Sequence, residues 1–216
     1  MVKGVIFDMD GLMFDSEQIY ARFWRETSAR YGYPIKEEHL TFLRGAIRDF
    51  QVKKFTEWFG PQVPALDIIT DSLQATATHL LTYPIPHKPG LEALLTTLRD
   101  RGIPAAVATS SRRAKMDRIL EREGVRPFFA QVVCGDEVPR GKPDPAIFLK
   151  AAEKLGVPPQ ECFVLEDSFN GIRAAHAAGA MPIMVPDMDK PTPEITALCT
   201  HVVERLDDVI PLLDVH

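Results

Sequence analysis

Short runs of apolar residues alternate with longer amphipathic stretches over most of this chain. The short runs contain mainly small or β-branched residues, which is typical of buried strands. A buried strand on both faces shows no polar alternation, and none is seen within these runs. The predicted strands are Val5–Phe7, Ala105–Ala108, Gln131–Cys134, Phe163–Leu165 and Met181–Val185, with Val202–Val203 as a last short candidate.

Amphipathic stretches separate the later strands, and their apolar residues recur at helical spacing. Each stretch is followed closely by a glycine, which favours helix termination. Repeated strand–helix units predict an α/β fold, with a parallel sheet and helices on both faces. The helices expected in this part are Leu91–Arg101, Arg112–Glu123, Pro145–Leu155 and Asn170–Ala178.

The region between the first and second strands has a different character. It shows no convincing strand, and Asp15 and Ser16 are candidates to cap its first helix. A proline-rich connector at 83–90 follows it. We therefore expect an α/β core from residues 1–14 and 86–216, with residues 15–85 inserted as a helical domain. The helices expected in the insertion are Glu17–Tyr31, Lys36–Leu43, Ala46–Phe59 and Pro64–Leu81.

Composition narrows the possible partners and compartment. The net charge of −5 argues against nucleic acid or an anionic membrane surface as the main partner. No apolar run approaches the roughly 20 residues that span a bilayer, and the N-terminal residues lack a signal-peptide core. The cysteines Cys134, Cys162 and Cys199 are widely spaced, which indicates free thiols in a reducing compartment. We expect a cytoplasmic protein.

Two carboxylates, Asp8 and Asp10, follow the first predicted strand, and Gly11 permits a turn after them. Carboxylates beside a core are costly unless a cation, strong hydrogen-bond donors or solvent compensates them. The simplest alternative is that both residues lie in a solvated loop. The choice depends on whether other polar residues arrive at the same place.

Polar residues follow the other strands as well. Parallel strands all end at one edge of a sheet, where ligands bind. The residues expected at this edge are Thr109, Ser110 and Ser111 after the second strand, Lys142 after the third, and Glu166 and Asp167 after the fourth. Such a cluster of carboxylates fits Mg²⁺, and together with a lysine and a hydroxyl it would suit phosphoryl transfer.

Each of these residues also has an ordinary structural explanation. Thr109 could end a strand, and Lys142 could be a surface lysine in a Gly/Pro turn. Asp144 precedes Pro145, which favours a helix-capping role over a ligand role. Asn170 could start a helix or support the site. Asp136 and Glu137 are expected in a loop that shapes the rim.

The motifs taken together resemble those of the haloacid dehalogenase superfamily, in its β-phosphoglucomutase-like phosphatase branch. Asp8-Met9-Asp10-Gly11 matches the first motif, Thr109 the second, Lys142 the third, and Glu166-Asp167-Ser168 the fourth. The resemblance covers nearly the whole chain. It implies a Rossmann-like core, a helical cap that closes over the substrate, and a monomer.

The resemblance also implies roles for these residues. Asp8 would form an aspartyl-phosphate, Asp10 would be the general acid and base, and Thr109, Ser110 and Lys142 would bind the phosphoryl group. Mg²⁺ would be held by Asp8, the Asp10 carbonyl, and Asp167 with Glu166. The substrate would be a small phosphorylated metabolite, a sugar or nucleoside phosphate. Candidate substrate contacts are Ser16, Tyr20, Arg44, Arg48 and Asn170.

Other functions remain open at this point. Phosphomutases of this branch carry a histidine one turn after the Ser/Thr of the first cap helix, where this chain has Tyr20. Dehalogenases lack the second aspartate, which Asp10 supplies here. Receiver domains share an acidic cluster with Thr and Lys, but they are shorter and lack an inserted cap. A phosphatase is the prediction that fits the sequence best.

Overall fold

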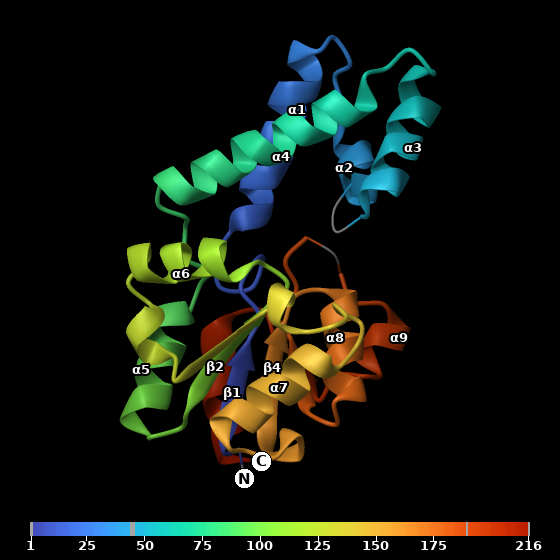
Figure 1. Cartoon of the computed structure of the whole chain (residues 1–216). Coiled ribbons are helices and arrows are strands. Elements are labelled where there is room, and N and C mark those ends of the chain that lie inside the picture. The colour runs from blue at the N-terminus through green and yellow to red at the C-terminus, as the bar shows by residue number, and fades with distance from the viewer. Residues whose placement is uncertain (1, 44–45, 189, 216) are drawn as a thin grey trace. The chain divides into compact units, whose positions relative to one another are not determined.

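The computed structural model describes residues 2–43, 46–188 and 190–215, and it contains two compact units (Figure 1). Residues 1–15 and 84–216 form one unit, here called the core unit. Residues 16–83 form the other, here called the helical unit. Among the described helices, none is both long and apolar enough to cross a lipid bilayer.

The core unit is built on a parallel sheet, which confirms the predicted α/β fold. Its six strands, counted over the described residues, lie in the order β3-β2-β1-β4-β5-β6. The central strand pairs with β2 on one side, with Phe7 opposite Val107, and with β4 on the other, with Phe7 opposite Leu165. The strands are β1 (Gly4–Phe7), β2 (Ala105–Thr109), β3 (Gln131–Cys134), β4 (Cys162–Glu166), β5 (Met181–Met184) and β6 (His201–Val202).

Apolar layers cover both faces of this sheet. Ile6, Ala108 and Val164 point to one face and pack against α7 (Ala146–Leu155) and α8 (Phe169–Ala177). Side chains alternate along a strand, so Phe7 points to the opposite face, where it meets Phe129 edge to face. Figure 1 shows α7 in front of the sheet and the C-terminal segment behind it. Burial of both faces explains why the strands read as continuous apolar runs.

The remaining elements of the core unit connect and flank these layers. Helix α5 packs against the C-terminal 3₁₀ segment η4, and α6 packs against β3. The short α9 and the 3₁₀ segments are absent from the sequence-based prediction, because they are too short or irregular for a helical period. These elements are α5 (Leu91–Asp100), α6 (Arg113–Arg122), α9 (Pro193–Thr196), η1 (Arg126–Phe128), η2 (Gly135–Glu137), η3 (Pro159–Glu161) and η4 (Leu206–Asp214).

The helical unit has its own apolar core. Helices α1 and α4 pack along each other, and α3 packs against α4. Trp24 and Phe55 contribute large buried side chains to this core, with ring centroids 6.0 Å apart. The third helix begins at Arg48 rather than at the predicted Ala46. The helices are α1 (Ser16–Arg30), α2 (Glu37–Leu43), α3 (Arg48–Phe59) and α4 (Ala65–Thr82).

The two chain segments that leave the core unit lie side by side. The backbone N–H of Asp15 donates to the carbonyl of Pro86 at 2.9 Å, and Phe14 forms a bridge with His87. A further hydrogen bond joins the Lys88 N–H to the Met13 carbonyl at 2.9 Å. The insertion therefore departs from and returns to one place in the core unit, a few residues beyond Asp10.

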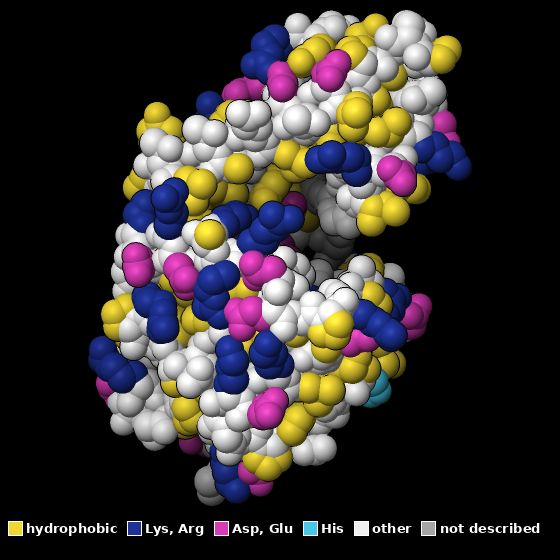
Figure 2. All heavy atoms as spheres, viewed as in Figure 1, with side chains coloured by type: hydrophobic (Ala, Val, Ile, Leu, Met, Phe, Trp, Pro, Cys, Tyr) yellow, Lys and Arg dark blue, Asp and Glu magenta, His cyan; other side chains and the backbone are white. Residues whose placement is uncertain are grey.

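Basic and acidic side chains are interspersed on the face drawn in Figure 2. Exposed ion pairs occur among the described residues, such as Arg22 with Glu26 at 2.7 Å. Exposed pairs of this kind contribute about 0.2 to 1 kcal/mol each.

Candidate active site

The predicted site residues gather at the carboxyl ends of the central strands. Asp8 follows β1 directly, Thr109 is the last residue of β2, and Glu166 is the last residue of β4. The chain runs outward to β3 on one side of β1 and then continues through β4 on the other. This reversal of strand order is where open α/β sheets bind their ligands.

Lys142 is the residue that joins the strand ends. Its Nζ lies 2.5 Å from Oδ1 of Asp8 and 2.6 Å from Oε1 of Glu166, and it donates to the Ala108 carbonyl at 3.2 Å. The lysine is a buried ammonium rather than a surface turn residue, with a side chain only 7% exposed. Burial lowers its pKa, but the charges of Asp8 and Glu166 outweigh this and hold the pKa above its usual value.

The surroundings of Asp8 and Asp167 disfavour negative charge on both carboxyl groups. Burial, opposed by Lys142 and assisted by Glu166, raises the pKa of Asp8 to about 7. Burial and the charges of Glu166 and Asp8 likewise raise the pKa of Asp167 well above its usual range. Carboxylate oxygens of Asp8, Glu166 and Asp167 lie within 4.8 Å of one another. A group of this kind fits a hard divalent cation, which would remove the mutual repulsion.

Glu166 is fully buried, and both of its oxygens have protein donors. Lys142 contacts Oε1, while the Ser168 N–H and hydroxyl donate to Oε2 at 3.0 and 2.9 Å. Ser168 also caps α8, because its Oγ accepts from the Gly171 N–H. A Cβ on Gly171 would lie 1.9 Å from the Glu166 carboxyl carbon. Glycine at this position therefore allows the carboxylate to pack against the start of α8.

A second glycine allows Asp167 to approach the Asp8–Asp10 loop. Gly11 has a φ of 87°, in the left-handed region, and a Cβ there would lie 2.3 Å from Oδ2 of Asp167. Any other residue would both strain the backbone and displace the carboxylate. The Asp-x-Asp-Gly sequence thus serves the site through its glycine as well as its acids.

Asp10 lies beside two side chains from the segment after β2. The Ser111 hydroxyl donates to Oδ2 at 2.8 Å, and Lys115 Nζ lies 3.5 Å from Oδ1. Lys115 is not among the residues that the sequence singled out. The sequence signal that could have identified Lys115 is its position four residues after Ser111, at the start of a helix, because residues at this spacing lie on the same side.

Thr109 is buried at the end of β2, and its hydroxyl accepts from the Ser111 N–H at 3.1 Å. Ser110 is exposed beside it. The sequence predicted that β2 and β4 end just before Thr109 and Glu166. Each strand instead includes that residue as its last, so the sheet rather than a loop holds both side chains.

The other candidates have simpler surroundings. The predicted N-cap role of Asp144 is wrong, because Pro145 occupies the N-cap position of α7. Asp144 lies one residue earlier, and its side chain accepts from the Ala146 N–H at 3.0 Å. Asn170 is exposed at the second position of α8. This location agrees with the expectation that Asn170 lies at the start of a helix. Its role in substrate binding stays a prediction.

The remaining candidates, Ser16, Tyr20, Arg44 and Arg48, belong to the helical unit. Helix α1 begins at Ser16, whose buried Oγ has no hydrogen-bond partner among the described residues. Tyr20 packs partly against the apolar core of its unit. Arg48 is exposed at the start of α3, and Arg44 lies outside the described residues.

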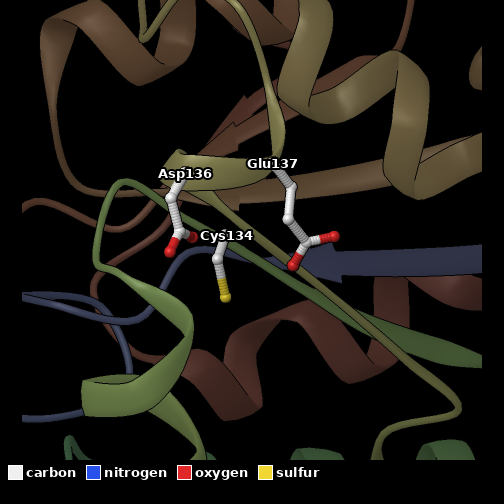
Figure 3. A group of neighbouring side chains, drawn as sticks. All are labelled: Cys134, Asp136 and Glu137. Atoms are coloured by element: carbon white, nitrogen blue, oxygen red, sulfur yellow. The ribbon is translucent and has the colours of Figure 1, made fainter.

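A second group with metal-ligand chemistry, drawn in Figure 3, comprises Cys134, Asp136 and Glu137. Its acids already have protein partners: Arg113 pairs with Glu137 and donates its N–H to Asp136, and Lys154 lies 3.1 Å from Glu137. Burial raises the pKa of the Cys134 thiol to about 12, which opposes metal binding as a thiolate. The expected rim loop is instead a 3₁₀ turn tied to α6 and α7 by ion pairs.

The family model for haloacid dehalogenase-like hydrolases matches residues 2–179. The chain belongs to that family. It is 34% identical over 220 residues to a Drosophila melanogaster protein named "Probable pseudouridine-5'-phosphatase", covering 97% of this chain and 92% of the relative. It is 33% identical over 178 residues to the fructose-1-phosphate phosphatase YqaB of Escherichia coli K12, covering 82% and 92%.

Solved structures agree with this assignment. A haloacid dehalogenase family hydrolase from Deinococcus radiodurans R1, solved with bound phosphate and sodium, superimposes with a TM-score of 0.85. The two chains are 25% identical, and the match covers 98% of this chain and 95% of the other. The fold of the whole chain is therefore shared with that hydrolase.

Proposed function

We propose that this protein is a Mg²⁺-dependent phosphatase that hydrolyses a small phosphorylated metabolite, a sugar or nucleoside phosphate, through an aspartyl-phosphate on Asp8. The observation that carries the proposal is the convergence of Lys142, Asp8 and Asp167 from three distant segments. Sequence relatives named as phosphatases support the reaction class.

The carboxylates fit a magnesium ion. In this proposal Asp8, the Asp10 carbonyl and Asp167 hold the ion. Glu166 lies beside them, and its engagement by Lys142 and Ser168 suits an anchoring role better than direct coordination. When bound, Mg²⁺ would neutralise negative charge on the phosphoryl group.

The first half of the reaction uses Asp8 as the nucleophile. Its carboxylate oxygen attacks phosphorus, and the bond between phosphorus and the substrate oxygen breaks. Asp10 gives a proton to that leaving oxygen, so the alcohol departs neutral. Lys142, Thr109 and Ser110 bind the phosphoryl oxygens, where a buried ammonium is most effective because water is excluded.

The second half returns the enzyme to its starting state. Asp10, now ionised, takes a proton from water, and the resulting hydroxide attacks the phosphorus of the aspartyl-phosphate. The bond between phosphorus and the Asp8 oxygen breaks, which releases inorganic phosphate and restores the Asp8 carboxylate. Asp10 lies two residues beyond the nucleophile, so a single carboxyl group can serve both steps.

The helical insertion would act as a cap that excludes bulk water during the reaction. The paired connections at Asp15 and Pro86 suit a hinge, because both ends of the insertion leave from one place. Substrate selection would then lie with Ser16, Tyr20, Arg44 and Arg48 of the insertion, and with Asn170 of α8.

A screen of phosphorylated sugars and nucleotides with Mg²⁺, measuring inorganic phosphate, tests the proposal. Turnover of at least one ester, lost in Asp8→Asn and slowed in both half-reactions in Asp10→Asn, is expected. An acid-quenched sample should retain phosphate on Asp8. Phosphate release by Asp8→Asn at the wild-type rate would refute the mechanism, and isomerisation of the ester without phosphate release would indicate a phosphomutase.

A further inference from the structure

Lys115, in the first turn of α6, has no role in the proposed reaction as described so far, yet it lies beside Asp10. Its Nζ is 3.5 Å from Oδ1 of Asp10 and 3.2 Å from the hydroxyl oxygen of Ser111. The side chains of Lys115 and Asp10 are 22% and 26% exposed. The pair is therefore partly shielded from solvent, where an ion pair holds its geometry better than at a fully exposed surface.

The three polar groups have defined hydrogen-bonding directions. An ammonium group can only donate, so the Ser111 oxygen must accept from Lys115. The single hydroxyl hydrogen of Ser111 is then directed to Oδ2 of Asp10, which lies 2.8 Å away. Each oxygen of the Asp10 carboxylate thus faces a different donor, and the plane of the carboxylate is fixed from two sides.

The position of Lys115 in its helix strengthens this interpretation. The first turn of α6 has no acidic residue. A lysine there opposes the helix dipole, which favours negative charge at the N-terminus. Local helix preference therefore does not explain the lysine, whereas its tertiary contact with Asp10 does. Local rules are most often broken at functional sites.

We propose that Lys115 is a positioning residue for Asp10: together with Ser111 it orients the carboxylate for proton transfer to the leaving substrate oxygen and from the attacking water. The inference rests on the proposed function, because it assigns Lys115 a role through the general acid and base. A proton-transfer group that is misplaced by about 1 Å can lose a large part of its effect.

The first test compares three variants by steady-state kinetics on whichever ester the wild type hydrolyses. Lys115→Met keeps the apolar stem and removes the charge, and it should lower kcat about tenfold while KM stays within about twofold, as expected for loss of one charge-assisted donor. Lys115→Arg restores a cation and should recover most of the rate. Lys154→Met removes a lysine paired with Glu137 and should leave the rate unchanged.

The second test separates positioning from direct substrate binding. In an Asp10→Asn background, Lys115→Met should have no further effect on the residual rate, since the residue acts through Asp10. A rise in KM of similar size in both backgrounds would overturn the inference and make Lys115 a substrate ligand. An unchanged kcat in Lys115→Met would overturn it as well.

The third test needs no turnover. In metal-free protein, the melting temperatures of Asp10→Asn, Lys115→Met and the double variant should be non-additive, with the double variant shifted by less than the sum. Additive shifts would refute the pairing.

If the wild type hydrolyses no ester, the proposed function fails. If the wild type is active and Lys115→Met has the same activity, only the assignment of Lys115 is contradicted.

Discussion

Lys142 Nζ lies 2.5 Å from Oδ1 of Asp8, although 134 residues separate them in the chain. The same ammonium lies 2.6 Å from Glu166. One buried cation therefore contacts two buried carboxylates, and Asp167 nearby adds a third acid. The core unit holds an excess of negative charge at this place, which a divalent cation would relieve.

Replacing Lys142 by Met should destabilise the metal-free protein strongly. The substitution leaves Asp8 and Glu166 buried without their counter-charge, and removal of one partner from a buried pair costs about 3 to 5 kcal/mol. Urea unfolding at pH 8 in the presence of a chelator measures the effect. Lys150→Met, which removes a half-exposed lysine near Glu137, should cost less than about 1 kcal/mol. Equal effects of the two substitutions would contradict the buried-pair argument.

Asp8→Asn should abolish turnover without lowering the melting temperature of the metal-free protein at pH 8. The raised pKa of Asp8 means that its surroundings disfavour the charged form, so a neutral residue of the same shape removes an unfavourable charge. Differential scanning calorimetry and the phosphate-release assay measure both effects. An Asp8→Asn variant that is inactive and also has a lowered melting temperature would contradict this prediction.

Stability of the metal-free protein should fall as pH rises from about 4 to about 7. The pKa of Asp8 is about 7 in the folded protein and near 3.8 when unfolded, so the folded state binds the extra proton in this window. Each such proton changes stability by about 1.4 kcal/mol per pH unit. The shift at Asp167 acts in the same direction.

Added Mg²⁺ should therefore raise the melting temperature more at pH 8 than at pH 5, because protons compete with the ion at low pH. Melting curves with and without Mg²⁺ at the two pH values measure this difference. An equal or larger shift at pH 5 would show that the ion binds elsewhere. The variant Asp167→Asn should lose most of the shift at pH 8.

Gly171→Ala should reduce both stability and activity. The added Cβ would lie 1.9 Å from the carboxyl carbon of Glu166, so the carboxylate must move and its contact with Lys142 is disturbed. Overpacking of this kind costs about 1 to 3 kcal/mol, which exceeds the helix propensity that alanine gains. Gly141→Ala is the matched control, because no atom lies within 4 Å of a Cβ there. Retained wild-type activity in Gly171→Ala would contradict the anchoring role of Glu166.

Much of the fold follows from local sequence patterns. The apolar runs at Val5–Phe7 and Phe163–Leu165 are strands, as predicted, because both faces of a parallel sheet are buried. The pattern says little about exact ends, so Thr109 and Glu166 were expected after their strands and are their last residues instead. The C-terminal η4 has no clear period and includes Pro211, and it was not predicted.

By itself, the sequence determined that polar residues after separate strands would gather at one edge, because parallel strands of one sheet all end on the same side. Only the tertiary structure decided which atoms meet. Lys142 contacts both Asp8 and Glu166, and Ser168 donates to the other carboxylate oxygen of Glu166. Lys115 contacts Asp10. Such contacts depend on strand register and side-chain rotamers. These are fixed by packing among residues far apart in the chain, and no local pattern encodes them.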